Sequence, residues 1–311
     1  MELRQLRYFV AIVDHGSLSR AARVLHVAQP ALTQQIQQLE DELAAQLLHR
    51  SAQGVLATDA GKTFYEHALA ILKQVEDARS AVAQSADKPS GTVALGIPQS
   101  VSSALALPLL TAVRHTYPEI SLQLTEELSG TLIDQLKSGR INLAVLFDDG
   151  QLGAFATTPL VEEDMMFIAR ADSRYAPAGT SIPLSLAVKV PLILPGLQHG
   201  VRPRIENCVR AAGLSVDNVI DINSVAILKS ALLADLGATI LPVAPLLSEI
   251  ERGQLIAYPI DGVHISRTVS LCSSKNIPLT NAAAAVRKLV LAVARDLCDS
   301  GQWTSAQALG A

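Results

Sequence analysis

The stretch that most constrains the fold is residues 17–43, SLSRAARVLHVAQPALTQQIQQLEDEL, where apolar side chains recur at helical spacing in two short runs. Ser17 is a good N-cap for the first run, because its hydroxyl can accept from a backbone N–H that lacks a partner within the helix. A second helix can begin at Gln29 and Pro30, since proline is tolerated in a first helical turn. The apolar face of that second helix comprises Leu32, Ile36, Leu39 and Leu43. This pattern indicates a helix-turn-helix, whose second helix lies in the major groove of DNA.

The opposite face of the second helix is polar and can hydrogen-bond to base edges; it carries Gln29, Thr33, Gln34 and Gln37. Two amphipathic helices joined by a short turn also occur in many all-helical proteins that do not bind DNA. The two helices alone therefore leave both interpretations open.

The wider context favours DNA binding. The run SLSRAARVLHVAQPALTQQIQQLEDELAAQLLHR, followed by GVLATDAG, resembles the N-terminal signature of the LysR-type transcriptional regulators. The resemblance is specific over residues 3–61 and continues less specifically to about residue 297. The segments IVDHGSL, HVAQPAL, GTVALGI and INLAVLF also look similar to the family's nitrogen assimilation control subgroup. Two positions depart from the family: Ala28 replaces a common capping serine, and Gln53 stands where many relatives carry a basic residue.

The resemblance implies a winged helix-turn-helix, a long linker helix and an effector domain of two periplasmic-binding-protein-like subdomains. A hairpin over residues 47–58, with its turn at Gln53 and Gly54, would be the wing, and Arg50 matches the family's backbone-contacting arginine. The net charge of −4 does not favour binding to nucleic acid, so the affinity for DNA must come from where the charges are placed. The acids at residues 40–42 fall at the far end of the second helix, away from its base-reading start. The expected DNA-binding residues are Ser17, Arg20, Arg23, Gln29, Pro30, Ala31, Thr33, Gln34, Gln37, Arg50 and Gln53.

A long helix is expected over residues 58–85, with Thr58 as its cap. Its apolar residues follow one another by three or four positions, which is a heptad seam; this dimer seam comprises Phe64, Ala68, Ile71, Val75, Ala78 and Val82. A helix of roughly 40 Å could not bury the seam alone, so the sequence predicts a dimer. The alternative is that the seam packs on the chain's own effector domain. Pro89 ends the helix, and we place the hinge there.

From residue 92 to about residue 297, expected strands and helices alternate in the manner of α/β proteins with mostly parallel sheets. Expected strands cover residues 92–97, 121–127, 141–147, 165–171, 192–195, 219–222, 238–241 and 269–273. The resemblance implies crossing strands between two subdomains near residues 161–169 and 260–269. The predicted domains are residues 1–58 (DNA-binding), 59–90 (linker), 91–300 (effector-binding) and 301–311 (tail). The tail is polar apart from Trp303, and we expect it to be loosely held.

Ligands of open α/β sheets bind beyond the carboxyl ends of strands, where helix N-termini present free N–H groups. The candidate effector-binding residues at such turns are Gln99, Ser100, Ser102, Ser129, Thr131, His199, Arg202 and Asn223. Their hydroxyls and amides suit a small polar or anionic effector, whose charge His199 or Arg202 could neutralise. Each turn taken by itself is better explained as ordinary helix capping.

Other function classes find little support. No G-x-S-x-G, P-loop or H-E-x-x-H motif occurs, the histidines are scattered, and the three cysteines lack metal or disulfide spacing. We therefore expect no catalytic residue, metal or cofactor. We find no membrane span or secretory signal and expect a cytoplasmic protein without membrane contact. A plain solute-binding protein would leave the winged helix unexplained.

The sequence thus predicts a transcriptional regulator that binds an interrupted inverted repeat in double-stranded DNA as a homodimer or homotetramer and acts on RNA polymerase. Target genes, activation versus repression, and the need for an effector stay open.

Overall fold

The computed structural model of the protein describes residues 1–51, 54–83, 88–148, 150, 152–196 and 201–309. The chain forms two compact units, one built on Met1–Ala83 and one containing most of the remaining residues. Each unit has its own hydrophobic core, so each is described by itself.

The N-terminal unit is a winged helix-turn-helix followed by a long helix. Its elements are α1 (Leu3–His15), α2 (Leu18–Val24), α3 (Gln29–Leu43), the antiparallel strands β1 (Leu48–Ser51) and β2 (Gly54–Ala57), and α4 (Asp59–Ala83). The core is formed by the apolar stripes of the three short helices, including Phe9, Ile12, Leu32 and Ile36, all of which are fully buried. The predicted helix-turn-helix, hairpin and long helix are confirmed.

Local interactions explain where these elements begin. Ser17 Oγ accepts from Arg20 N at 3.4 Å, which confirms its role as the cap of α2. Thr58 Oγ1 accepts from Gly61 N at 2.9 Å and so caps α4. Gly54 has a φ of +137°, and a Cβ there would lie 2.8 Å from Gly16 O. The wing, defined as the β1–β2 hairpin, therefore needs glycine at this position to approach the turn between α1 and α2.

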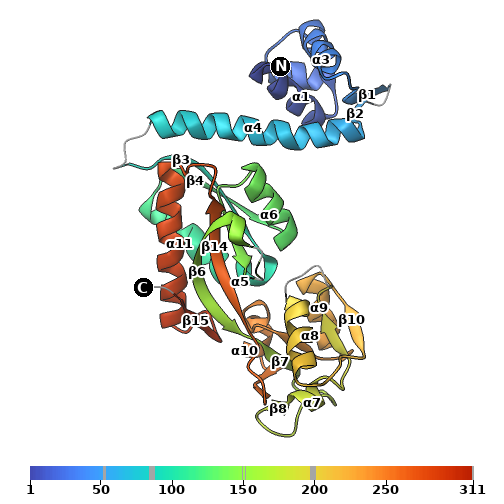
Figure 1. The fold of residues 1–311 in the computed structure, drawn as a ribbon, viewed down its shortest axis with the longest axis vertical. Coiled ribbons are helices and arrows are strands. Elements are labelled where there is room, and N and C mark those ends of the chain that lie inside the picture. The colour runs from blue at the N-terminus through green and yellow to red at the C-terminus, as the bar shows by residue number, and fades with distance from the viewer. Residues whose placement is uncertain (52–53, 84–87, 149, 151, 197–200, 310–311) are drawn as a thin grey trace. The chain divides into compact units, whose positions relative to one another are not determined.

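The first subdomain of the C-terminal unit is a six-stranded sheet covered by helices on both faces (Figure 1). The strand order is β15 (Ala306–Ala308), β6 (Phe155–Asp164), β14 (Ser266–Ser274), β5 (Leu143–Phe147), β3 (Gly91–Ile97) and β4 (Ile120–Glu126). Alternation along β3 sends Val93 and Leu95 to the core beneath α5 (Gln99–Thr116) and α11 (Asn281–Asp299). Ala94 faces the smaller core under α6 (Ser129–Ser138). The 3-10 turn η1 comprises Leu152–Ala154.

The second subdomain has its own core, centred on Phe167, Ile193 and Ile240. Its strands are β7 (Met166–Arg170), β11 (Thr239–Leu241), β12 (Leu255–Tyr258), β9 (Leu192–Leu194), β10 (Val219–Asp221), β8 (Ile182–Pro183) and β13 (Ile260–Asp261). Its helices are α7 (Leu184–Ala187), α8 (Val201–Ala211), α9 (Val225–Leu233), η2 (Ala244–Leu246) and α10 (Leu247–Glu251). The chain passes between the subdomains at Asp164–Met165 and again at Ile265–Ser266, where Met165 N donates to Ile265 O at 2.8 Å. Two crossing strands were expected in these regions.

The sheets are mixed and not mostly parallel, so that prediction was wrong. β3 pairs in parallel with β4 and β5, but β14 pairs antiparallel with both β5 and β6, and β7 pairs antiparallel with β11 and β12. The reason lies in the crossing strands, which enter and leave each subdomain beside each other in opposite directions.

The prediction of a loosely held tail was also wrong. Trp303 is 1% exposed, and its Nε1 donates to Glu163 Oε1 at 2.8 Å. Beyond it, β15 adds an antiparallel edge strand to β6. The tail as far as residue 309 is therefore part of the first subdomain.

Candidate nucleic-acid interface and ligand cleft

The polar face of α3 is open to solvent. Leu32, Ile36 and Leu39 are fully buried on the opposite side, whereas Gln29, Pro30, Ala31, Gln34 and Gln37 are exposed and Thr33 is half-buried. Ala28 precedes the helix without a side-chain cap, and α3 contains no arginine or lysine. The neutral polar side chains of this face are thus available for hydrogen bonding, although their contact with DNA stays a prediction.

Two of the exposed glutamines already have side-chain partners. Ser19 Oγ, on α2, donates to Gln29 Oε1 at 2.8 Å. Gln37 Nε2 donates to Asp41 Oδ1 at 3.0 Å, one turn along the same helix. Gln29 is therefore linked to a second helix, while the Gln37 bond stays within α3.

The predicted arginines lie on exposed surface, but not all of them are equally free. Arg20 and Arg23 are exposed on α2. Arg50, on the wing, has an exposed fraction of 36%, and its Nη2 lies 3.7 Å from Glu40 Oε2. The positive charge of Arg50 is therefore partly compensated by the Glu40 carboxylate. Gln53 lies outside the described residues.

Glu40 is a structural residue that the sequence analysis overlooked. It is 8% exposed, and its Oε1 accepts from Leu47 N at 2.8 Å and from Leu48 N at 3.1 Å. These bonds attach the start of the wing to α3. A signal was present, since Glu40 is four residues after the buried Ile36 and therefore falls on the apolar face.

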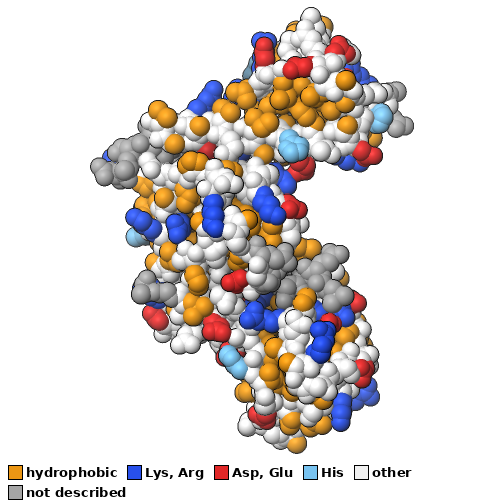
Figure 2. Space-filling model, in the orientation of Figure 1, with side chains coloured by type: hydrophobic (Ala, Val, Ile, Leu, Met, Phe, Trp, Pro, Cys, Tyr) orange, Lys and Arg blue, Asp and Glu red, His pale blue; other side chains and the backbone are white. Residues whose placement is uncertain are grey.

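The predicted dimer seam divides into two parts. Ala68 is fully buried, and Phe64 makes an edge-to-face contact with Phe9, with ring centroids 5.2 Å apart. Phe64 therefore packs against the core of its own unit, and Ala68 is inaccessible within the single chain, so their assignment to an intersubunit seam was wrong. Farther along α4, Ile71 is 36% exposed, Val82 is 89% exposed, Ala78 is exposed and Val75 is half-buried. Figure 2 shows hydrophobic side chains gathered on the visible face of this unit.

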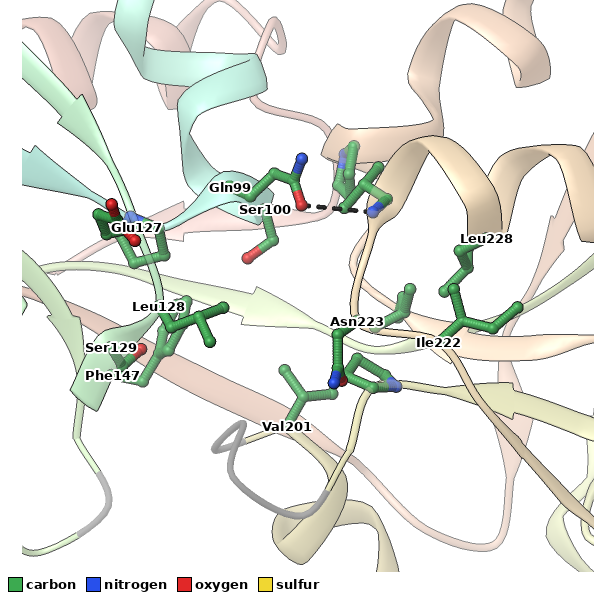
Figure 3. Close-up of a pocket in the computed structure, with 15 residues that line it drawn as sticks. Gln99, Ser100, Glu127, Leu128, Ser129, Phe147, Val201, Ile222, Asn223 and Leu228 are labelled. Atoms are coloured by element: carbon green, nitrogen blue, oxygen red, sulfur yellow. Dashed lines mark hydrogen bonds between the residues drawn. The ribbon is translucent and has the colours of Figure 1, made fainter. Parts of the chain in front are cut away.

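The C-terminal unit contains a small cleft between its two subdomains (Figure 3). The cleft is partly open to solvent, has a volume of about 70 Å³ and is mainly apolar, with Phe147, Leu128, Ile222 and Leu228 among its lining residues. Gln99 Oε1, on the first subdomain, accepts from Val225 N, on the second, at 3.3 Å across the cleft. A ligand that fitted the volume of this cleft would have only a few non-hydrogen atoms, unless the cleft opened.

Four of the eight candidate effector residues line this cleft: Gln99, Ser100, Ser129 and Asn223. Asn223 Oδ1 accepts from Gly196 N at 2.7 Å, so part of its polar capacity has a structural use. Ser102 lies one helical turn away, and its hydroxyl is within hydrogen-bond distance of Gln99 O, at 3.0 Å, and of the Glu126 carboxylate. His199 lies outside the described residues.

Of the candidate effector residues, Thr131 and Arg202 do not join Ser100 in the cleft, so their assignment as ligand residues was wrong. Thr131 is exposed and does not line the cleft. Arg202 Nε donates to Glu206 Oε1 at 2.8 Å, and Nη1 donates to Asp221. The hydrogen bond to Glu206 raises the pKa of Arg202. The guanidinium is directed along α8 and toward the end of β10, so we withdraw it as a ligand residue.

A buried ion pair that the sequence analysis missed lies behind the cleft. Arg267 and Glu163 are 2% and 1% exposed, and Arg267 Nε lies 2.6 Å from Glu163 Oε2. Arg267 Nη2 donates to Ser100 Oγ at 3.0 Å, and its guanidinium lies 4.0 Å from the centroid of the Phe147 ring. Because Ser100 and Phe147 line the cleft, this pair fixes one of its walls. The pairing joins residues about a hundred positions apart, which no local pattern indicates.

The described residues contain no candidate metal site and no disulfide. Among them, no group of three or more His, Cys, Asp or Glu side chains is placed to hold a metal ion. Cys208, Cys272 and Cys298 are free, and burial raises the pKa of Cys272 and of Cys298 to about 11. No helix in the described part of the chain is long and apolar enough to cross a membrane.

Comparisons with known proteins agree with this architecture. Residues 3–62 match the bacterial regulatory helix-turn-helix protein, lysR family, and residues 86–295 match the LysR substrate binding domain. The nitrogen assimilation regulatory protein nac of Klebsiella aerogenes is 36% identical over 294 residues, covering 94% of this chain and 95% of that protein. Its counterpart in Escherichia coli K12 is 34% identical, covering 97% and 99% of the two chains.

A solved structure of full-length CbnR complexed with its target DNA has the same fold, with a TM-score of 0.69 at 21% identity, over 94% of this chain and 100% of that one. The chain therefore belongs to the LysR family of DNA-binding transcriptional regulators.

Proposed function

We propose that this regulator binds an interrupted inverted repeat as a homodimer and recognises A·T pairs in each half-site with the polar face of α3. The observation that carries the proposal is that this exposed face has glutamines and a threonine but no arginine or lysine. The commonest specific contact, a bidentate pair from arginine to guanine, is therefore absent from the helix. Glutamine matches the donor and acceptor of adenine, and Thr33 can contact a thymine methyl.

We assign the predicted contacts of the three arginines a different role, which is to position the protein on DNA. Arg20, Arg23 and Arg50 are placed on exposed surface of α2 and the wing, where they can contact phosphates. Phosphate contacts fix the register of the protein on DNA and carry no direct sequence information. The partial pairing of Arg50 with Glu40 limits its contribution to affinity.

The dimer forms through the distal part of α4. Ile71 and Val82 are apolar, are exposed in the single chain and lie on the heptad stripe. We assign residues 1–58 to DNA binding, 59–90 to the linker, 91–300 to the effector domain and 301–311 to the tail. Pairs of dimers form a tetramer, in which the effector domains set the DNA bend and thus the contact with RNA polymerase. The protein acts in the cytoplasm by binding and not by catalysis.

A small polar molecule is the effector class that the cleft fits, if the protein uses one. Gln99, Ser100, Ser129 and Asn223 offer hydroxyl and amide groups within an apolar wall. Arg202, one of the two residues expected to neutralise an anionic effector, is paired with Glu206 and Asp221. An anion would therefore have to compete with two carboxylates for this guanidinium.

Selection of bound sequences from a random duplex library tests the proposal. The full-length protein should enrich two half-sites of inverted symmetry with A·T pairs at the positions that face Gln29, Thr33 and Gln34. Enrichment of a single half-site, or of G·C at all of these positions, would refute the corresponding part.

A further inference from the structure

The hydrogen bond between Ser19 and Gln29 connects the two helices of the helix-turn-helix on their exposed side. Ser19 Oγ donates to Gln29 Oε1 at 2.8 Å across ten residues of chain. Both side chains are exposed, so the bond is not needed to satisfy a buried polar group. By contrast, the Gln35–Gln38 and Gln37–Asp41 bonds lie within α3 and can form in an isolated helix.

The backbone positions that present these two side chains are fixed. α2 is held against the core by Ala21 and Ala22, which are 0% and 4% exposed, and its N-terminus is capped by Ser17. Gln29 is the first residue of α3, whose Leu32 is fully buried three positions later. Ser19 therefore holds the end of the Gln29 side chain from a support outside its own helix.

Holding this end has a chemical consequence for a DNA contact. A free glutamine loses rotamer freedom when it is ordered, and a base contact must overcome this loss. In the observed arrangement the Ser19 hydroxyl occupies one of the two acceptor positions of Oε1. The second acceptor position and both Nε2 hydrogens stay available, which are the groups required for adenine N6 and N7.

We propose that Ser19 is a specificity-determining positioning residue, which orders the Gln29 carboxamide for base recognition before DNA binds. The inference rests on the proposed reading of a base pair by Gln29. Ser19 itself need not contact DNA; it acts through the side chain that does.

The test is a double-mutant cycle in the full-length protein, with binding measured against single-base variants of its operator. Gln29→Ala should lower the preference at one base-pair position by about ten- to a hundredfold. Ser19→Ala should lower the preference at the same position by about three- to tenfold, the effect of one hydrogen bond. In the Gln29→Ala background, Ser19→Ala should change the preference less than about twofold, because the side chain that it positions is gone.

Two controls distinguish positioning from damage to the fold. Ser19→Thr keeps the hydroxyl and should restore the preference, whereas a structural defect would lower affinity for every sequence. The preference that is lost in Gln34→Ala should be unchanged in Ser19→Ala.

The outcomes separate the inference from the proposal on which it rests. If Gln29→Ala lowers one preference and Ser19→Ala does not, or if the two effects are additive, the role of Ser19 is overturned while base reading by Gln29 stands. If Gln29→Ala lowers no preference at any position, both are overturned.

Discussion

Replacing Glu40 by alanine should detach the wing from α3. The substitution removes the acceptor of Leu47 N and Leu48 N, two N–H groups next to side chains that are 2% and 1% exposed. An unsatisfied buried donor costs about 1–3 kcal/mol, so the pair costs about 2–6 kcal/mol. Glu40→Gln is the matched variant, because its amide oxygen can still accept both bonds while the charge next to Arg50 is lost.

Hydrogen exchange of the Leu47 and Leu48 amides in the full-length protein measures this effect locally. Global unfolding of a chain with several cores is not a two-state process and would not report on the wing alone. We expect Glu40→Ala to accelerate exchange roughly 30-fold or more, the equivalent of about 2 kcal/mol, and Glu40→Gln to change it far less. Equal exchange in Glu40→Ala and the wild type would refute the role of Glu40.

Three further predictions concern the rest of the chain. Ile71→Asp should place a charge in the proposed dimer contact at a cost of about 3–5 kcal/mol; sedimentation that shows the variant fully dimeric at micromolar concentration would contradict that contact. Trp303→Phe removes the indole donor to Glu163 and should weaken the docking of the tail by about 1–3 kcal/mol; unchanged hydrogen exchange of the β15 amides would show that this bond contributes nothing. Burial raises the pKa of Cys272 to about 11, so its alkylation at pH 8 should be about a hundredfold slower than that of a free cysteine and should accelerate as the pH rises toward 11; mass spectrometry showing rapid labelling at pH 8 would contradict this.

The sequence predicted the elements whose signals are local. Apolar stripes at helical spacing and the cap at Ser17 lead directly to α2 and α3, and the cap at Thr58 marks the start of α4. The same periodicity misassigned Phe64, because a heptad stripe does not say whether its partner is a second chain or α1 of the same unit. It also misassigned Ala68, which is buried within the single chain.

The site residues that the sequence could not predict depend on contacts between distant segments. Arg202 looked free for a ligand, but its partner Asp221 lies nineteen positions along the chain and on another element. Glu163 receives bonds from Arg267 and from Trp303, which come from two other parts of the chain. Their pairing follows from the crossing strands and the docked tail, both of which depend on the tertiary fold.

The central claim is that the glutamine face of α3 selects the bases while the arginines only position the protein. Its most direct test compares Gln29→Ala and Arg50→Ala for binding to a panel of single-base operator variants at two salt concentrations. We predict that Gln29→Ala loses discrimination at one base-pair position, worth about 1–3 kcal/mol. Arg50→Ala should weaken binding to all sequences alike and reduce the salt dependence of affinity, because phosphate contacts release counterions. A uniform loss in Gln29→Ala together with an altered base preference in Arg50→Ala would contradict the account.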